Sequence, residues 1–440
     1  MSYNADQKTK VMVIAHGHPD HAKGGGEIAA YNLHKQINAS SGYDSVFLAR
    51  HQNKELIHAG TPTAGTGRDK EIIIHATMPD WFRFSQPDKA LVWRDFRQSL
   101  ETSQPHIVHF HHYLHLGLEF IREVKNFDPE IRIVLTLHEY YGICHHQGQM
   151  VKTDRSLCYE SSADACARCF SQHTAQDFML RKLFINAHFD LVDRFISPSH
   201  FLKQRYVAWG LPEHKVEVIE NLLDETEDTT APAEMPLCTH HDQRLRLAYF
   251  GQINWFKGLD LLLEAVSLLP ASIKQSIALD INGSGLEHQP QALRDSIQQK
   301  LREHENVVNF RGPYTREELP QLMAEADWLV VPSRWWENSP MVMLEASKYG
   351  LPVICSNIGG MAEKIEHGKT GLHFQARRAD ALANTIIWAN KNRDKQPEFS
   401  AAIAQSYKST RSLKQHLAIY QSILAPRHNA LTTNSDRHAA

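Results

Sequence analysis

Short apolar segments alternate with longer amphipathic stretches along almost the whole chain. The first half opens with the apolar segment Val11–Ala15, which a loop and a helical stretch from about Glu27 to Ile37 follow. The same alternation starts again at Leu245–Phe250. Strands that alternate with helices typically form parallel sheets with helices packed on their faces. The pattern therefore predicts an α/β protein.

The alternating segments fall into two series, and a chain of 440 residues is long enough for two cores. We expect a first domain over 1–220, a linker over 221–243, a second domain over 244–408, a helix over 409–425 that crosses back to the first domain, and a flexible tail over 426–440. The predicted strands are Val11–Ala15, Ser45–Ala49, Ile72–His75, Ile107–Phe110, Ile131–Leu137 and Arg194–Ser197 in the first series, then Leu245–Phe250, Ile277–Asn282, Val307–Arg311, Trp328–Val331 and Val353–Cys355 in the second.

The charge balance and the apolar runs exclude some classes of protein. Lys and Arg number 47 and Asp and Glu number 50, so the formal net charge is −3 and no basic field indicates a nucleic-acid partner. No apolar run is long enough to span a bilayer, and Val11–Ala15 is too short for the core of a signal peptide. We therefore expect a cytoplasmic protein whose six cysteines form no disulfide framework.

The segment from Trp328 to Glu345 carries the most specific chemical pattern. An apolar strand leads into a loop with Glu337, then Ser339 and Pro340 suit the N-cap and first position of a helix that holds Glu345 in its second turn. The amides and the dipole at a helix start favour a bound anion such as phosphate. Carboxylates beside such a site suit sugar hydroxyls, so the segment predicts a nucleotide-sugar site.

This segment resembles glycosyltransferase family 4, a large family of retaining enzymes with the GT-B fold. The resemblance implies two Rossmann-like domains whose parallel sheets face an interdomain cleft. It covers the second half almost end to end. The matching features include Pro332-Ser333, Asn338-Ser339-Pro340, Phe250-Gly251-Gln252, Lys257-Gly258, Asn282-Gly283-Ser284-Gly285, Phe310-Arg311-Gly312 and Gly359-Gly360.

The resemblance assigns roles to three residues of the second half. Glu345 would accept hydrogen bonds from the ribose of the donor, Glu337 would hold hydroxyls of the transferred sugar, and Lys257 would neutralise the departing diphosphate. A solvated first-turn lysine is the alternative for Lys257. The other donor-side residues that the resemblance indicates are Gly25, Gly26, Gly251, Gln252, Gly283, Gly285, Arg334, Asn338 and Ser339.

One departure from the family pattern concerns the second cation on the diphosphate. The family commonly has an arginine where this chain has Gln252, and we expect Arg334 to supply that charge from the other side of the site. The loop Lys23–Glu27 contains three glycines, which allow close approach of the backbone to a ligand. It lacks the dinucleotide fingerprint, so a plain turn is its alternative interpretation.

Histidines follow two of the predicted strands of the first half, at the ends that would face the cleft. The resemblance matches His138 to the family's active-site histidine, with Glu139 in place of the usual aspartate. We also place Glu139, His111 and His112 on the acceptor side, although histidines at strand ends are more often structural. The resemblance implies no catalytic metal ion and no cofactor beyond the donor itself.

Four cysteines follow the His138 segment. Cys166 and Cys169 are separated by two residues, a spacing that lets both thiolates reach one tetrahedral ion, and Cys144 and Cys158 lie upstream. The four residues predict a structural zinc site that stiffens the acceptor-side loop. The alternative is a set of reduced thiols in that loop.

Two segments offer peripheral contact with a membrane. Phe178–Phe195 mixes basic and apolar residues, which suits either an interfacial helix or, more commonly, a buried amphipathic helix. Trp81–Phe84 is an aromatic and basic segment that suits contact with a lipid-linked acceptor. Both remain secondary to the donor-site pattern.

We therefore predict a retaining hexosyltransferase that uses a UDP- or GDP-sugar and a saccharide or lipid-linked saccharide acceptor in surface polysaccharide synthesis. A catalytically silent GT-B subunit that binds another glycosyltransferase is the first rival hypothesis, which Gln252 keeps open. A nucleotide-sugar epimerase and a phosphorylase of related fold are two further hypotheses.

Overall fold

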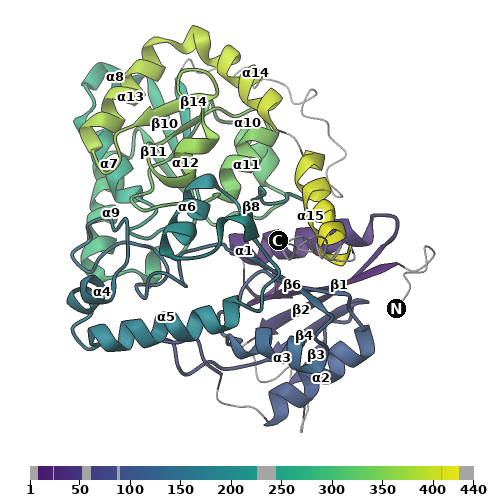
Figure 1. Ribbon diagram of the computed structural model, residues 1–440. Helices are drawn as coiled ribbons and strands as arrows, with labels where there is room; N and C mark the ends of the chain where they lie inside the picture. The colour runs from purple at the N-terminus through teal and green to yellow at the C-terminus, as the bar shows by residue number, and fades with distance from the viewer. Residues whose placement is uncertain are drawn as a thin grey trace, which may run out of the picture.

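The computed structural model describes residues 8–22, 24–51, 61–86, 90–224, 244–407 and 409–425. They form two sheets with helices packed around them (Figure 1). The first sheet has the order β3-β4-β2-β1-β5-β6-β7-β8, and the second has the order β11-β10-β9-β12-β13-β14. Every strand pairing in the two sheets is parallel except that of β3 with β4, so the α/β prediction is confirmed.

The first half builds its sheet from strands that are buried on both faces. Val11 and Val13 of β1 belong to the core on one face of the sheet, whereas Met12 and Ile14 belong to the core on the other. The strands are β1 Thr9–Ala15, β2 Tyr43–His51, β3 Thr63–Gly65, β4 Glu71–His75, β5 Ile107–Phe110, β6 Arg132–Thr136, β7 Arg194–Ser197 and β8 Val216–Val218. The helices are α1 Gly25–Asn38, α2 Ala90–Ser103, α3 Glu119–Phe127, α4 Ala163–Cys169, α5 Ala175–Phe189 and α6 His200–Trp209, with the short helix η2 Glu213–Lys215.

The second half repeats the plan. Leu247 and Tyr249 of its central strand face one core and Ala248 and Phe250 face the other. The strands are β9 Leu245–Phe250, β10 Ile277–Asn282, β11 Val308–Gly312, β12 Trp328–Val331, β13 Val353–Ser356 and β14 Gly371–Phe374. The helices are α7 Leu259–Leu268, α8 Ala271–Gln275, α9 Gln291–Glu303, α10 Leu319–Ala324, α11 Met341–Lys348, α12 Gly359–Lys364, α13 Ala379–Lys391, α14 Gln396–Ser406 and α15 Ser409–Leu424, with the short helices η4 Leu286–His288 and η5 Arg393–Lys395.

Each strand expected from the sequence is present, with ends that differ by at most two residues. Strands β3, β8 and β14 were not predicted, because they are three or four residues long and too short to show a period. The expected linker lies largely outside the described residues, as does the expected tail over 426–440. The domain boundaries themselves stay predictions.

Helix α15 packs against the first half although it follows the second half in the chain. It lies beside α1 in Figure 1, and Ile419, Tyr420 and Ile423 join the core that holds Val11 of β1. The Tyr420 hydroxyl lies 2.6 Å from Nδ1 of His109 on β5. The C-terminal helix thus links the two halves: it follows the second half in the chain and packs against the core of the first.

No helix in the described part of the chain is long and apolar enough to cross a membrane. Most of the segment that suggested an interfacial helix lies in α5, and the Phe178, Ile185 and Phe189 side chains are buried in the first half. The buried-helix alternative therefore accounts for one face of α5. Met179, Leu180 and Leu183 are exposed on it.

We predict that Tyr420→Ala lowers the free energy of unfolding by about 3–5 kcal/mol, because it removes a fully buried aromatic ring. Tyr420→Phe should cost about 1–2 kcal/mol, because it removes only the partner of His109. Urea denaturation followed by circular dichroism measures both values. Equal losses in the two variants would show that packing of the ring does not hold α15 in place.

Candidate active site

A pocket of about 370 Å³ lies between the two halves, at the carboxyl ends of β6 and β9. In parallel α/β sheets this edge is where ligands bind. Its lining includes many of the residues that the sequence analysis selected. From the first half these are Gly25, Gly26, His138 and Glu139, and from the second half Gly251, Gln252, Lys257, Glu337, Asn338, Ser339 and Glu345.

Glu337 lies at the centre of a set of donors. Its Oε1 atom lies 2.6 Å from Nζ of Lys257, and it accepts hydrogen bonds from Oγ of Ser333 at 2.8 Å and Nε1 of Trp335 at 2.9 Å. The carboxylate is 6% exposed, so these three donors replace water around its charge. Glu337 is thus fixed as a charged, oriented acceptor at the pocket wall.

The backbone after β9 brings Lys257 to Glu337. Gly258, the N-cap residue of α7, has φ 73°, and a Cβ atom on it would lie 2.1 Å from the carbonyl oxygen of Pro332. Only glycine fits such an approach. The backbone N–H of Lys257 donates to Oδ1 of Asn254 at 3.0 Å, which holds the turn. Two loops of the second half are thus in contact, and the cation and the carboxylate face each other.

Two glycines at the start of α12 support the same loop from behind. A Cβ atom on Gly360 would lie 1.8 Å from the carbonyl oxygen of Asn338, and the Gly360 N–H donates to the Glu337 carbonyl at 2.6 Å. Gly359 has φ 63° and approaches the same backbone. The family-like glycine pair therefore supports the loop that carries Glu337.

The loop also locks onto the first half through Asn338. Its Nδ2 donates to the carbonyl of His138 at 2.7 Å, and its Oδ1 accepts from the Tyr140 hydroxyl at 2.6 Å. Both groups of the amide are used, so its orientation is fixed. The loop carrying Glu337 is thereby held at a set place relative to His138 on the opposite wall.

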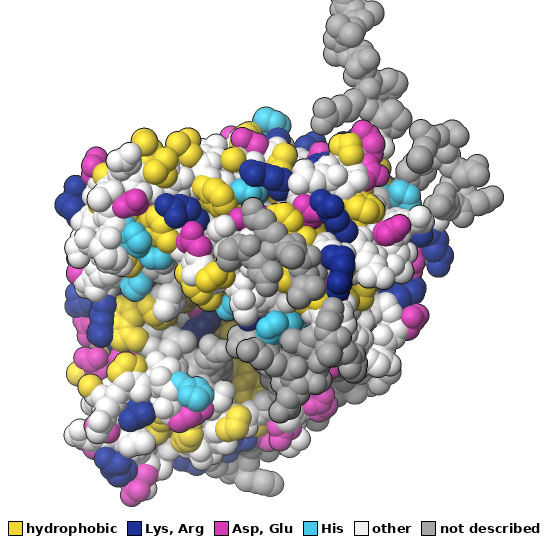
Figure 2. Space-filling model, turned by 90° about the horizontal axis from the view of Figure 1, so that it is seen from below, with side chains coloured by type: hydrophobic (Ala, Val, Ile, Leu, Met, Phe, Trp, Pro, Cys, Tyr) yellow, Lys and Arg dark blue, Asp and Glu magenta, His cyan; other side chains and the backbone are white. Residues whose placement is uncertain are grey.

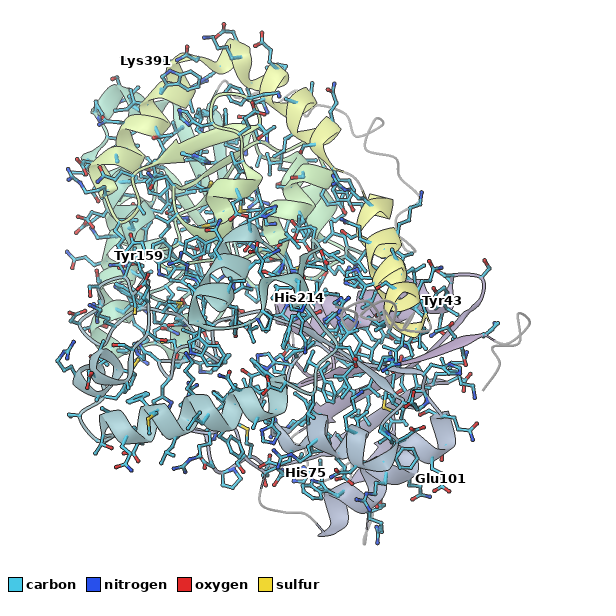
Figure 3. All side chains as sticks on the ribbon, in the orientation of Figure 1. Tyr43, His75, Glu101, Tyr159, His214 and Lys391 are labelled. Carbon is cyan, nitrogen blue, oxygen red and sulfur yellow. The ribbon has the colours of Figure 1, made fainter. Side chains whose placement is uncertain are left out.

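Trp336 makes the second contact between the halves. Its side chain is 3% exposed within the core of the first half, stacks on Phe201 at 4.9 Å and donates from Nε1 to the carbonyl of Cys158 at 3.0 Å. Tyr159 packs edge-on against it at 4.8 Å, where the two halves meet (Figure 3). A large apolar side chain of one half thus completes the core of the other.

The prediction that Ser339 caps α11 is wrong. The N-cap is Pro340, and the Ser339 hydroxyl donates to the carboxylate of Glu220 instead, which also pairs with Lys364. The carboxylate is a charged acceptor and competes successfully for the hydroxyl. Glu337 lies before the helix and Glu345 inside it, as predicted.

Glu345 is partly buried at the pocket wall. Burial raises its pKa to about 7, and the nearby charges of Arg316 and Lys348 oppose that rise without cancelling it. The carboxyl group therefore titrates near neutral pH. A donor of hydrogen bonds in the pocket would favour its ionised form.

The histidines of the first half form pairs. His111 Nδ1 lies 3.1 Å from His138 Nε2, and His112 Nε2 lies 3.0 Å from a carboxylate oxygen of Glu139. Burial lowers the pKa of His138 to about 4 and that of His111 well below its usual value, so both rings are neutral at neutral pH. His138 and Glu139 line the pocket, and His111 and His112 lie behind them as supports.

Three residues expected at the donor have other partners. A Cβ atom on Gly283 would lie 2.2 Å from the Gly251 carbonyl oxygen, and Gly285, at φ 94°, lies beside the backbone of Ile253. Arg334 instead pairs with Asp260, at 2.7 Å to each carboxylate oxygen. Its charge is already compensated, so the structure does not place it as the second cation that we predicted.

The cysteines do not form the predicted metal group. No three His, Cys, Asp or Glu side chains within the described ranges are arranged to hold a metal ion. The Cys158 thiol donates to the carbonyl of Glu160, and Cys169 Sγ accepts from the backbone N–H of Thr153. Burial raises the pKa of Cys144 to about 11, which favours the thiol. The alternative of reduced thiols, with Cys166 the fourth, agrees with this structure.

Two family models match consecutive parts of the chain. One, described as Glycosyltransferase Family 4, matches residues 23–227, and another, described as Glycosyl transferases group 1, matches residues 239–406. The pocket lies between the two matched parts.

The chain belongs to glycosyltransferase family 4.

Two curated relatives of this family 4 chain match parts of it. It is 26% identical over 238 residues to an uncharacterized 41.2 kDa protein in the cps region of Klebsiella pneumoniae, covering 52% of this chain and 62% of that protein. It is 30% identical over 141 residues to glycogen synthase of Thermus thermophilus, covering 32% of this chain and 30% of that enzyme. The chain thus spans less than two thirds of the length of these relatives.

Solved structures show the fold. Anabaena HepE in complex with UDP and glucose has a TM-score of 0.65 and 15% identity, with 94% of this chain and all of that chain covered. Sucrose-phosphate synthase of Thermosynechococcus elongatus has a TM-score of 0.66 and 17% identity, with 95% of this chain and all of that chain covered. The predicted GT-B fold is confirmed.

Sequence reasoning missed the residues that position this family 4 site. Tyr140 holds Asn338, Glu220 holds Ser339, and Asp260 binds Arg334. Tyr140 directly follows the predicted pair of His138 and Glu139, which was the one available signal. The other two partners are distant in sequence and match no motif, so only the folded chain brings them together. Lys23 of the glycine loop lies outside the described residues.

We predict that Glu345→Gln stabilises the protein more as the pH rises. Burial raises the pKa of this carboxyl group from 4.5 to about 7, so below pH 4.5 it is protonated in both the folded and the unfolded state and costs no stability. As the pH rises through 7, the folded state must hold an unfavourable charge, and the free energy of unfolding falls. The variant should therefore match the native protein near pH 4.5 and exceed it by about 3 kcal/mol at pH 8. Thermal unfolding from pH 5 to 8 measures this gap. A gap that stays constant over that range would contradict the pKa assigned to Glu345.

Proposed function

We propose that this protein transfers a hexose from a nucleoside diphosphate sugar to a hydroxyl of a saccharide or lipid-linked acceptor, with retention at the anomeric carbon. One observation carries the proposal. A single pocket combines a cation and carboxylates of the second half with a neutral histidine and a glycine loop of the first. Membership of family 4 supports retention, and the complex of Anabaena HepE with UDP and glucose supports a nucleotide-sugar donor.

In this proposal, each residue of the pocket contacts a different part of the donor. Glu345 accepts hydrogen bonds from the ribose, Lys257 neutralises the diphosphate, and Glu337 accepts from hydroxyls of the sugar. The backbone of Gly25 and Gly26, at the start of α1, approaches the phosphates from the opposite wall. A charge placed where the leaving group becomes more negative lowers the barrier.

The proposed reaction needs no protein base. The bond between the anomeric carbon and the diphosphate oxygen breaks, and the acceptor oxygen bonds to the same face of that carbon. The acceptor proton goes to the leaving diphosphate oxygen. The neutral ring of His138, held by His111, then orients the sugar or the acceptor and takes no proton from it. Because the two walls of the pocket are held in fixed positions, they keep the reacting atoms of donor and acceptor close together.

A silent GT-B subunit is the second candidate function, and one observation favours it. Gln252 stands where the family commonly has a cation, and Arg334 pairs with Asp260. Among the described residues, Lys257 is the single lysine or arginine that lines the pocket. One cation stabilises a leaving diphosphate less than two. Binding without turnover would then suffice for a partner enzyme.

We predict slow hydrolysis of a nucleoside diphosphate sugar by the purified protein, with a loss of about 10²–10³-fold in Lys257→Ala and in Glu337→Ala. UDP-glucose, UDP-galactose, UDP-N-acetylglucosamine and GDP-mannose are the probes, and release of UDP or GDP is the measurement. Lys369→Ala, which removes an exposed lysine of the second half, is the matched control. Thermal unfolding verifies that each variant is folded.

The outcomes separate the candidate functions. Hydrolysis that survives in both pocket variants would overturn the site assignment. Nucleotide binding without hydrolysis supports the silent subunit. Conversion of the sugar without its release indicates an epimerase, and turnover that requires inorganic phosphate indicates a phosphorylase.

A further inference from the structure

A second hollow opens on the first half, outside the donor pocket. Its volume is about 680 Å³, and its lining includes Asp80, Trp81, Phe82, Arg83, His145 and His173. It lies beside the first turns of α5, the helix at the lower left of Figure 1. The lower face, shown in Figure 2, carries hydrophobic side chains among charged ones and histidines.

Aromatic rings form the base of this hollow. Phe82 stacks on His173 with the ring centroids 3.9 Å apart and meets His145 edge-on at 5.0 Å. The Phe82 carbonyl accepts a hydrogen bond at 2.7 Å from Arg181, which is buried in α5. The rings are therefore held in place by packing and by a charged hydrogen bond. Trp81, at the margin, is 46% exposed.

A row of rings connects this hollow with the donor pocket. Trp81 meets His115 edge-on at 4.9 Å, and His115 stacks on His16 at 6.3 Å. His16 in turn lies 3.7 Å from the place of a Cβ atom on Gly26, which lines the donor pocket. The two hollows thus lie on one continuous aromatic path.

The backbone at His115 is strained in a way that suits a ligand site. It has φ 63°, a region that residues with a side chain seldom adopt and that concentrates at functional sites. Burial lowers its pKa to about 4, so the ring is neutral at neutral pH. This backbone conformation places the neutral ring of His115 between Trp81 and His16.

The chemistry of the path fits a sugar chain. The face of an aromatic ring carries partial negative charge and attracts the C–H face of a sugar ring. Asp80 and Arg83 pair at 3.4 Å at the margin and offer an acceptor and donors to hydroxyl groups. An anionic ligand fits less well, because Asp80 already neutralises Arg83 and Arg181 binds backbone carbonyls.

We propose that the hollow around Trp81 and the ring row to His16 bind the saccharide chain of the acceptor, beyond the unit that receives the new sugar. The ligand is a neutral oligosaccharide of at least two units. This inference rests on the proposed transfer function and deepens it: the acceptor is a chain rather than a single sugar.

The test is binding of the full-length protein to a printed array of neutral oligosaccharides of one to six units. The native protein should retain at least one oligosaccharide of two or more units, and Trp81→Ala should weaken that binding at least tenfold. Trp81→Phe keeps a ring and should retain most of it. His115→Asn tolerates the left-handed backbone but lacks the aromatic ring, and should weaken binding as well.

Two controls accompany the array. Trp388→Ala removes a partly exposed tryptophan of α13 in the second half and should change nothing. Hydrolysis of the donor sugar should be unchanged in Trp81→Ala, because Trp81 lies outside the donor pocket. Thermal unfolding shows whether each variant is folded.

Three results would overturn the inference. The native protein binds no saccharide on the array, or Trp81→Ala binds as well as the native protein, or Trp81 affects binding to vesicles of phosphatidylglycerol and phosphatidylcholine but not to saccharides. The last result would assign the hollow and the exposed Met179, Leu180 and Leu183 to a lipid surface. Saccharide binding that depends on Trp81, without donor hydrolysis, would refute the proposed transfer while leaving the saccharide site standing.

Discussion

The docking of one loop, residues 333–340, between the two halves is the interaction on which the site depends. Asn338 uses both ends of its amide across the boundary, and Trp336 fills the core of the opposite half. The residues on either side of Trp336 and Asn338 have no freedom to move independently, so the same contacts that join the halves also set the distance from Glu337 to His138. The contacts that hold the two halves together therefore also determine the geometry of the site.

This coupling explains why glycines are concentrated around the loop. Gly258 and Gly360 each allow a backbone approach that any Cβ atom would block, one from β9 and α7 and the other from α12. The loop is thus enclosed by backbone on two sides and by the first half on a third. A side chain at either glycine would collide with that backbone and displace the loop that carries Glu337.

The sequence predicted the repeated strand and helix pattern well, because buried parallel strands such as Trp328–Val331 are continuous apolar runs. It also located Glu337, Lys257, His138 and Glu345, because their neighbours match a family pattern. It failed where a partner is distant in sequence. Arg334 was predicted to be a cation of the donor site, but it pairs with Asp260. Ser339 was predicted to be an N-cap, but its hydroxyl donates to Glu220. Competition among partners is decided by the fold, and no local pattern reports it.

The ion pair of Lys257 and Glu337 has a consequence for selectivity. A nucleotide without a sugar brings phosphate oxygens to Lys257 but offers Glu337 nothing in exchange for the cation it loses. In the proposed reaction, a nucleoside diphosphate sugar would replace both partners at once, with phosphate on Lys257 and hydroxyls on Glu337. Separating this pair without replacing each member leaves the buried carboxylate of Glu337 without its cation. Under the proposed function, the pair would therefore favour the complete donor over the nucleotide product, which would help the product to leave.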